Sequence, residues 1–164
     1  METELTIEGC GFPPLSARGC QQELSIVEQG TFRRTVNGDL NYVGPKTHKY
    51  KSIIRCEDKT TLVNEGVLMR GATVRVGCLQ RLWQQGGRGF MTLEREAVSG
   101  SIAGIDRLQK LRIVHQVDAK TVELSDDDTF VSYRPWLVMR VIALTLNTDE
   151  WGLKAGWILE LEEI

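Results

Sequence analysis

Apolar and polar residues alternate along this chain with a period of two, which is typical of β-strands. The alternation is clearest over residues 71–79, where Val74, Val76 and Cys78 share one face. Some eight short segments of this kind are separated by Gly, Pro and Asp signals, and no convincing amphipathic helix interrupts them. The pattern predicts a mainly β fold: an antiparallel β-sandwich or partly open barrel with an irregular N-terminal arm and long loops.

The segment 133–164 predicts a C-terminal hairpin around which the rest of the chain is organised. Residues 135–146 are rich in Val, Ile, Leu and Thr, which is typical of a long strand that is apolar on both faces. The polar residues and glycine of 147–152 suit a reversal of the chain. We expect Trp136 and Trp157 to anchor the core. The apolar face of the second strand comprises Trp157, Leu159 and Leu161.

Residues 1–30 predict an arm or strap, because glycines and prolines at 9–14 interrupt regular structure. Within this arm, residues 21–28 are consistent with a strand that carries Leu24 and Ile26 inward, or with a single short helical turn.

The strongest local hairpin signal is Asn37-Gly38, because this pair accepts the two positive φ angles of a type I′ turn. Arg33 and Arg34 stand just before it. Neighbouring residues on a strand point to opposite faces, so we expect one arginine to be solvated and the other to meet an acidic partner or a subunit interface.

The glycines of residues 84–106 predict a flexible loop region, although residues 90–98 within it return to alternation with Met91, Leu93 and Ala97 on one face. Its stretch 86–89, which includes Arg88, is glycine-rich like a phosphate-binding loop. It lacks the Lys-Ser/Thr pair of a P-loop and the flanking strand and helix of a dinucleotide site, so a flexible loop is the preferred interpretation.

Length and composition are those of one ordinary soluble domain. The chain has 164 residues, 41% hydrophobic and 26% charged, with a formal net charge of -2. The charge balance lacks the basic excess that nucleic-acid binding requires, so we expect no nucleic-acid partner. The acidic N-terminus lacks the features of a secretory signal, and no stretch is long enough for a membrane span, so we expect no export by that route and no membrane association. The four cysteines lack CxxC spacing and are expected to be reduced.

Candidate chemistry is sparse. His48 and His115 stand far from any cluster with metal-ligand spacing, and the acidic run 126–128 lacks the pattern of a calcium loop, so it is interpreted as a solvated turn. No nucleophile elbow or informative carboxylate pair is present, and we expect neither enzymatic activity nor a cofactor. Trp151 is either a lid on the core or an exposed anchor for a neighbouring subunit.

Five segments spread over most of the chain carry a family resemblance: FPPLSARGCQQEL, FRRTVNGDL, KYKSIIRCED, GATVRVGCL and YRPWLVMRV…TDEWGLKAGWILELEE. Together they resemble a small β-rich tail-tip or baseplate structural protein of tailed bacteriophages. The most specific parts of the resemblance are residues 33–38, the turn 149–152, and the following Trp157 and residues 161–163. The resemblance implies a virion component without enzymatic activity, assembled in the host cytoplasm as a homo-oligomeric ring or trimer that contacts tube, hub or sheath proteins. The interface candidates are Arg33, Arg34, Trp83, Arg88 and Trp151.

Two other interpretations stay open. A small β-barrel binding module would hold nucleic acid or carbohydrate on residues that include Arg33, Arg34, Arg55, Arg75 and Trp83. The other is a wall-degrading tail hydrolase with a dispersed site.

Overall fold

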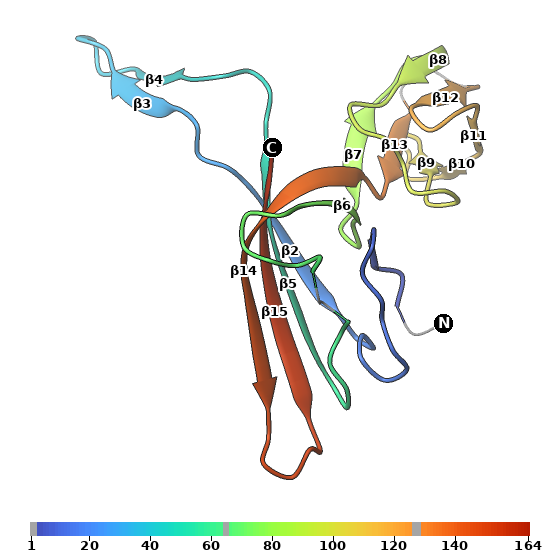
Figure 1. The fold of residues 1–164 in the computed structure, drawn as a ribbon. Coiled ribbons are helices and arrows are strands. Elements are labelled where there is room, and N and C mark those ends of the chain that lie inside the picture. Colours follow the sequence, from blue (N-terminus) through green and yellow to red (C-terminus); the bar gives the residue numbers. More distant parts are fainter. Residues whose placement is uncertain (1–2, 64–65, 126–128) are drawn as a thin grey trace.

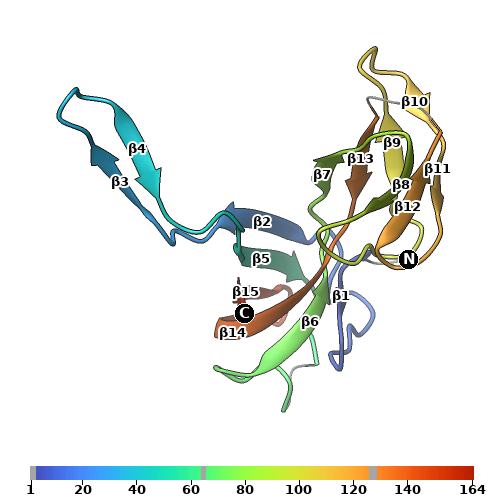
Figure 2. The same ribbon diagram turned by 90° about the horizontal axis from the view of Figure 1, so that it is seen from above.

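The computed structural model describes residues 3–63, 66–125 and 129–164, which form antiparallel β-sheets and no helix (Figure 1). The predicted mainly β, antiparallel class is therefore confirmed. The largest sheet has six strands in the order β1 (Thr6–Ile7), β6 (Thr73–Gly77), β14 (Trp136–Thr148), β15 (Ala155–Glu163), β5 (Tyr50–Asp58) and β2 (Gln21–Ile26). It is strongly curled and stays open between β1 and β2, like half of a barrel (Figures 1 and 2).

The long β14–β15 hairpin is the centre of this sheet, as predicted for residues 133–164. Trp157, Leu159 and Leu161 are almost completely buried, so the predicted inward face of β15 is confirmed. A register shift between Val141 and Ala143 marks a bulge in β14, which bends the strand and helps the sheet to curl. The surrounding core includes Leu5, Ile7, Ile54, Cys56, Val74, Val76, Leu137 and Met139.

Trp136 does not lie in the core, contrary to the prediction. It is half-buried at the start of β14, opposite Gly77 of β6. A Cβ atom at Gly77 would lie 3.2 Å from the Trp136 ring, so the indole covers the surface that the glycine leaves bare. The Arg75 guanidinium stacks on the ring, 4.5 Å from its centroid.

Two smaller sheets form a second lobe around its own hydrophobic cluster (Figure 2). One sheet has the order β10 (Leu111–Arg112), β9 (Ala103–Ile105), β13 (Phe130–Tyr133) and β7 (Leu82–Gln85). The other has the order β11 (Val114–Gln116), β12 (Thr121–Leu124) and β8 (Gly89–Thr92). The cluster comprises Leu93, Ala97, Val122, Leu124, Val131 and Tyr133.

The loop region predicted over 84–106 contains β8, β9 and the end of β7. The alternation of residues 90–98 was the better signal, because β8 begins this stretch and Leu93 and Ala97 are buried. Its glycines serve packing and turns instead. A Cβ atom at Gly86 would lie 2.2 Å from a methyl group of Leu124 and 2.6 Å from the sulfur of Met91. The absence of a side chain at Gly86 therefore permits close packing and does not signal a loop.

Two arginines join the lobes. Arg134, on the connection from β13 to β14, donates from Nε to the Cys78 carbonyl at 2.7 Å and from Nη1 to Glu4 at 2.9 Å. Arg95 of the second lobe donates from Nε to Glu163 at 2.9 Å and stacks on Tyr50 of the main sheet. Charge-assisted hydrogen bonds thus hold the second lobe against one end of the six-stranded sheet, where β6 and β15 end and β5 begins.

The predicted N-terminal arm, residues 1–30, is partly regular where it is described. β1 and β2 belong to the main sheet, while the segment 8–20 runs across its concave side as a strap. Leu24 is partly buried against the core, as predicted, but Ile26 is exposed because β2 ends at the edge of the sheet.

Candidate interaction surfaces

The residues between β2 and β5 form a hairpin that projects away from the body of the protein (Figures 1 and 2). We call residues 27–49 the arm; it contains β3 (Thr31–Arg34) and β4 (Leu40–Val43). Because β2 and β5 pair with each other, the arm is the far end of one long hairpin that bends away from the sheet. Every residue of β3 and β4 is exposed.

The arm turn confirms the predicted hairpin but not its turn type. Thr35 N–H donates to the Asp39 carbonyl, and Gly38 N–H to the Thr35 carbonyl, both at 2.9 Å. Gly38 has a φ of 87°, whereas Asn37 does not have a positive φ. The connection is therefore a three-residue loop with glycine in the left-handed position, and not a type I′ turn.

The apolar side chains of the arm are largely exposed to solvent in the single chain. Phe32 and Tyr42 pair across the two strands with ring centroids 5.3 Å apart, yet Phe32 is 69% exposed. An isolated two-stranded hairpin is at best marginally stable in water. Contact with another molecule that buries these side chains would therefore stabilise the arm. The exposed apolar residues of the arm are Phe32, Val36, Leu40, Tyr42 and Val43.

Arg33 and Arg34 lie on opposite faces of the arm, as predicted for neighbours on a strand. Arg34 donates from Nη1 to the Gly38 carbonyl at 2.9 Å and thereby supports the turn. Both arginines are exposed, and neither has a salt-bridge partner within the described ranges.

The base of the arm is a narrow neck formed by Gly30 and Gly44. A Cβ atom at either glycine would lie 2.4 Å from the Tyr42 hydroxyl, and one at Gly44 would also lie 2.8 Å from the Gly30 Cα. The missing side chains therefore allow the two chains and the Tyr42 ring to approach closely. Beside the neck lies an open hollow of about 460 Å³, lined by residues that include Ile26, Val27, Glu28, Phe32, Tyr42 and His48.

The turn that joins β14 to β15 forms a second protrusion, at the end of the main sheet far from the arm (Figure 1). We call residues 149–154 the tip. The Asp149 carboxylate accepts hydrogen bonds from Leu153 N–H at 2.7 Å and Lys154 N–H at 3.2 Å, and Gly152 takes a φ of 65°. This turn leaves Trp151 82% exposed. Of the two predicted alternatives, the lid on the core is therefore excluded.

The remaining interface candidates lie in the second lobe. Trp83 is an exposed residue of β7, and Arg88 is exposed in the turn before β8. The five candidates therefore occupy three separate places and form no single site. Sequence reasoning missed the apolar surface of the arm, although the alternation beside Asn37-Gly38 was a signal for it. It also missed exposed apolar residues of the second lobe: Phe90, Leu108, Leu111, Ile113 and Val117.

The residues expected to bind nucleic acid or carbohydrate in a small β-barrel module do not lie together in one site. Arg55 forms an ion pair with Glu23 at 3.4 Å, and Arg75 is held by Trp136 and by Glu8 at 2.8 Å. Arg33 and Arg34 lie on the arm and Trp83 in the second lobe. This arrangement gives no continuous basic groove lined with aromatic rings.

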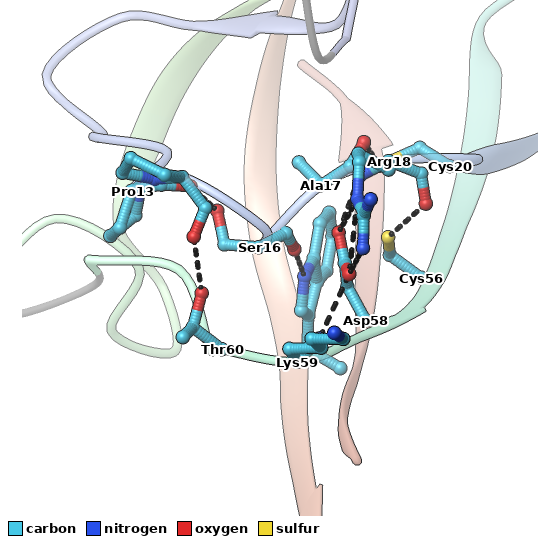
Figure 3. Close-up of polar contacts among 11 residues, drawn as sticks. Pro13, Ser16, Ala17, Arg18, Cys20, Cys56, Asp58, Lys59 and Thr60 are labelled. Atoms are coloured by element: carbon cyan, nitrogen blue, oxygen red, sulfur yellow. Dashed lines mark hydrogen bonds and ion pairs between the residues drawn. The ribbon is translucent and has the colours of Figure 1, made fainter. Parts of the chain in front are cut away.

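The strap is fixed to the concave side of the main sheet by a polar cluster (Figure 3). The Asp58 carboxylate accepts hydrogen bonds from Arg18 Nη2 at 2.7 Å and from the backbone N–H groups of Arg18 at 3.0 Å and Lys59 at 2.9 Å. These donors, the Arg18 guanidinium first, hold the pKa of Asp58 well below its usual range. Beside them, the indole N–H of Trp157 donates to the Ser16 carbonyl at 3.0 Å.

This ion pair predicts acid sensitivity of the strap. A carboxyl group whose pKa is depressed by folding stabilises the protein at pH values above its ordinary pKa, near 4, and that contribution is lost as pH falls through the folded pKa. We therefore expect the free energy of unfolding to decline below about pH 4. Asp58→Asn should lower stability at neutral pH and flatten this decline.

Denaturant unfolding at a series of pH values measures the effect, with Asp39→Asn on the exposed arm turn as the matched control. An unchanged pH slope in Asp58→Asn would contradict this assignment.

The thiols of the chain are poor nucleophiles in the folded state. The register that pairs Gln21 with Arg55 places Cys20 opposite Cys56. Burial, reinforced by the neighbouring Cys20, raises the pKa of Cys56 to about 12. Burial likewise raises the pKa of Cys10 and of Cys78 to about 11. Because the thiolate is the reactive and metal-binding form, this environment disfavours cysteine chemistry at neutral pH.

Within the described part of the chain, no three His, Cys, Asp or Glu residues gather in a way that would hold a metal ion. The acidic run 126–128 lies outside the described residues. None of the described segments forms a helix that is long and apolar enough to cross a membrane. Comparison with family models, curated proteins and solved structures found no match for this chain.

Proposed function

We propose that this protein is a structural component of a bacteriophage tail or baseplate, which assembles as a homo-oligomer and contacts other tail proteins. In this proposal it acts without catalysis or cofactor and resides in the tail of the virion. The observation that carries the proposal is the arm, whose apolar side chains lie outside both hydrophobic clusters. Large exposed apolar patches mark interaction sites in soluble proteins.

The resemblance to phage tail proteins supports the same proposal. Its two most specific stretches, 33–38 and 149–152, are the outer part of the arm and the turn of the tip. A plain surface hairpin or turn can be built from many sequences, because little of it is buried. A particular sequence at these protrusions is therefore better explained by contact with a partner than by folding.

The arrangement of the chain is suited to assembly. Two hydrophobic clusters and the strap stabilise the body without the arm or the tip. These protrusions remain available to bury apolar area against a neighbour, at about 25 cal/mol per Å² of apolar surface. Association can then bury the apolar side chains of the protrusions without removing any contact that stabilises the folded body.

The arm provides the direct test. The double variant Phe32→Ser/Tyr42→Ser is expected to weaken assembly at least tenfold, because it removes the paired aromatic rings. The free energy of unfolding of the monomer should change by less than about 1 kcal/mol, because both residues are exposed. Sedimentation velocity of the purified chain, alone and with co-expressed tail proteins, measures assembly.

Met69→Ser is the matched control, since Met69 is an exposed apolar residue outside the arm and the tip. Full assembly of the double variant would exclude the arm as an assembly contact. A wild-type chain that stays monomeric and joins no tail protein would refute the proposed function itself.

A further inference from the structure

The neck of the arm offers a site for an aromatic side chain. The hollow of about 460 Å³ lies between Ile26, where β2 ends, and the aromatic pair of Phe32 and Tyr42. Its volume is in the range of pockets that bind small ligands, and it is bordered by apolar and aromatic groups. Glu28, Gln29 and His48 are the polar residues among those that line it. Such a hollow suits an indole, which combines an apolar ring with one N–H donor.

The chain carries a matching group at its tip. Trp151 is the most exposed of the described tryptophans and is held on a turn that is rigidified by the Asp149 carboxylate. Leu153 beside it is also exposed. A tryptophan presented on an ordered turn loses little conformational freedom on binding, which is why tryptophan is enriched among the residues that dominate interface energies.

The net charges of the arm and the tip are complementary. The segment 27–50 contains four Lys or Arg and two Asp or Glu residues. Lys46 and Lys49 line, with His48, an adjoining hollow that Glu94 and Glu163 also border. Glu28 borders the hollow of the neck. The tip carries the consecutive residues Asp149 and Glu150 just before Trp151, and its Lys154 is paired with Glu57 at 3.0 Å. The arm as a whole thus carries an excess of positive charge and the tip an excess of negative charge, which favours the encounter of two copies.

The neck and the tip lie at opposite ends of the six-stranded sheet, so they do not meet within one chain (Figure 1). The start of β5, which leaves the neck, pairs with the C-terminal end of β15, whereas its end at Asp58 pairs with Ala155 beside the tip. A contact between them must therefore join two copies head to tail. Contacts of this type close into rings or continue as open helical assemblies.

We propose that Trp151 at the tip of one copy inserts into the neck hollow of a second copy of this chain, with Glu150 facing Lys46. This inference rests on the proposed function and names the contact that would build the homo-oligomer. The arm and the tip then act as the two halves of one heterologous interface.

Photo-cross-linking of the full chain tests this contact. Trp151 is replaced by the photoreactive residue p-benzoylphenylalanine, and the protein is mixed with ¹⁵N-labelled wild-type chain. Mass spectrometry of the cross-linked peptides then identifies links between different copies. We expect these links to fall in residues 26–30 and 42–48. A chain with the photoreactive residue at position 69 is the control and should give no links to this region.

Variants test the energetics in parallel. Trp151→Ala is expected to weaken self-association by roughly thirtyfold, as for an interface anchor. Glu150→Lys and Lys46→Glu should each weaken it by up to about fivefold, and the double variant should recover most of the loss.

Links from position 151 to another region of the second copy, or self-association that is unchanged in Trp151→Ala, would overturn the inference while leaving the proposed function intact. Assembly through the arm onto a different tail protein, with no self-association, would also overturn it. If the wild-type chain neither self-associates nor joins other tail proteins, both the inference and the proposed function fail.

Discussion

Replacing Trp157 with alanine is expected to lower the free energy of unfolding by about 3–5 kcal/mol, the usual cost of removing a large buried aromatic side chain. Trp157 is 1% exposed, and its indole N–H donates to the Ser16 carbonyl at 3.0 Å. Phe12 of the strap stacks on its ring with centroids 6.2 Å apart. The substitution therefore opens a cavity in the main core and also releases the strap from the sheet.

Equilibrium unfolding in denaturant, followed by circular dichroism, measures this loss. Trp151→Ala is the matched control, because it removes the same side chain from an exposed position on the same hairpin. Its free energy of unfolding should stay within about 0.5 kcal/mol of the wild-type value. Equal losses in both variants would show that Trp151 also contributes to the core.

The second large effect is expected at the joint between the two lobes. Arg134→Met should lower the free energy of unfolding by about 2–4 kcal/mol, because hydrogen bonds to charged groups contribute about 1.5–3 kcal/mol each and part of this is offset in water. Arg134 is buried, and its guanidinium reaches the Cys78 carbonyl at the end of β6 and both the side chain and the carbonyl of Glu4. Methionine fills much of the same space but makes none of these bonds.

Arg140→Met is the matched control, since Arg140 is an exposed residue of the neighbouring strand β14. Hydrogen exchange adds a local measurement. Amide protons of β1 and of the Cys78 region should lose protection in Arg134→Met and keep it in Arg140→Met. Unchanged protection around β1 would mean that the joint is held by packing alone.

The arm explains why a fold of this kind resists complete prediction from the sequence. Alternation around Phe32 and Tyr42 is the same whether a hairpin packs on its own core or projects into solvent. Local pattern encodes which residues share a face, but it does not encode what covers that face. The two environments differ only in contacts between residues that are distant along the chain or in other molecules.

In the stretch 84–106 the local sequence misleads in another way, because its glycines predict a loop where the structure contains strands. Its glycines match the composition of a loop, yet Gly86 packs against Leu124 and Met91. Glycine has two uses, conformational freedom and close approach, and composition cannot separate them. Trp136 is a related case, because an aromatic residue at a strand end can cover a glycine and meet an arginine as readily as enter a core.

The sequence by itself determined the β class, the C-terminal hairpin with its buried Trp157, Leu159 and Leu161, and the hairpin at Asn37-Gly38. These features depend on period-two alternation and turn chemistry, which act over a few residues. Only the tertiary structure decided that the chain builds two hydrophobic clusters, that the strap crosses the main sheet, and that the arm and Trp151 project from it. Those features depend on long-range pairing and on burial, which no short stretch of sequence specifies.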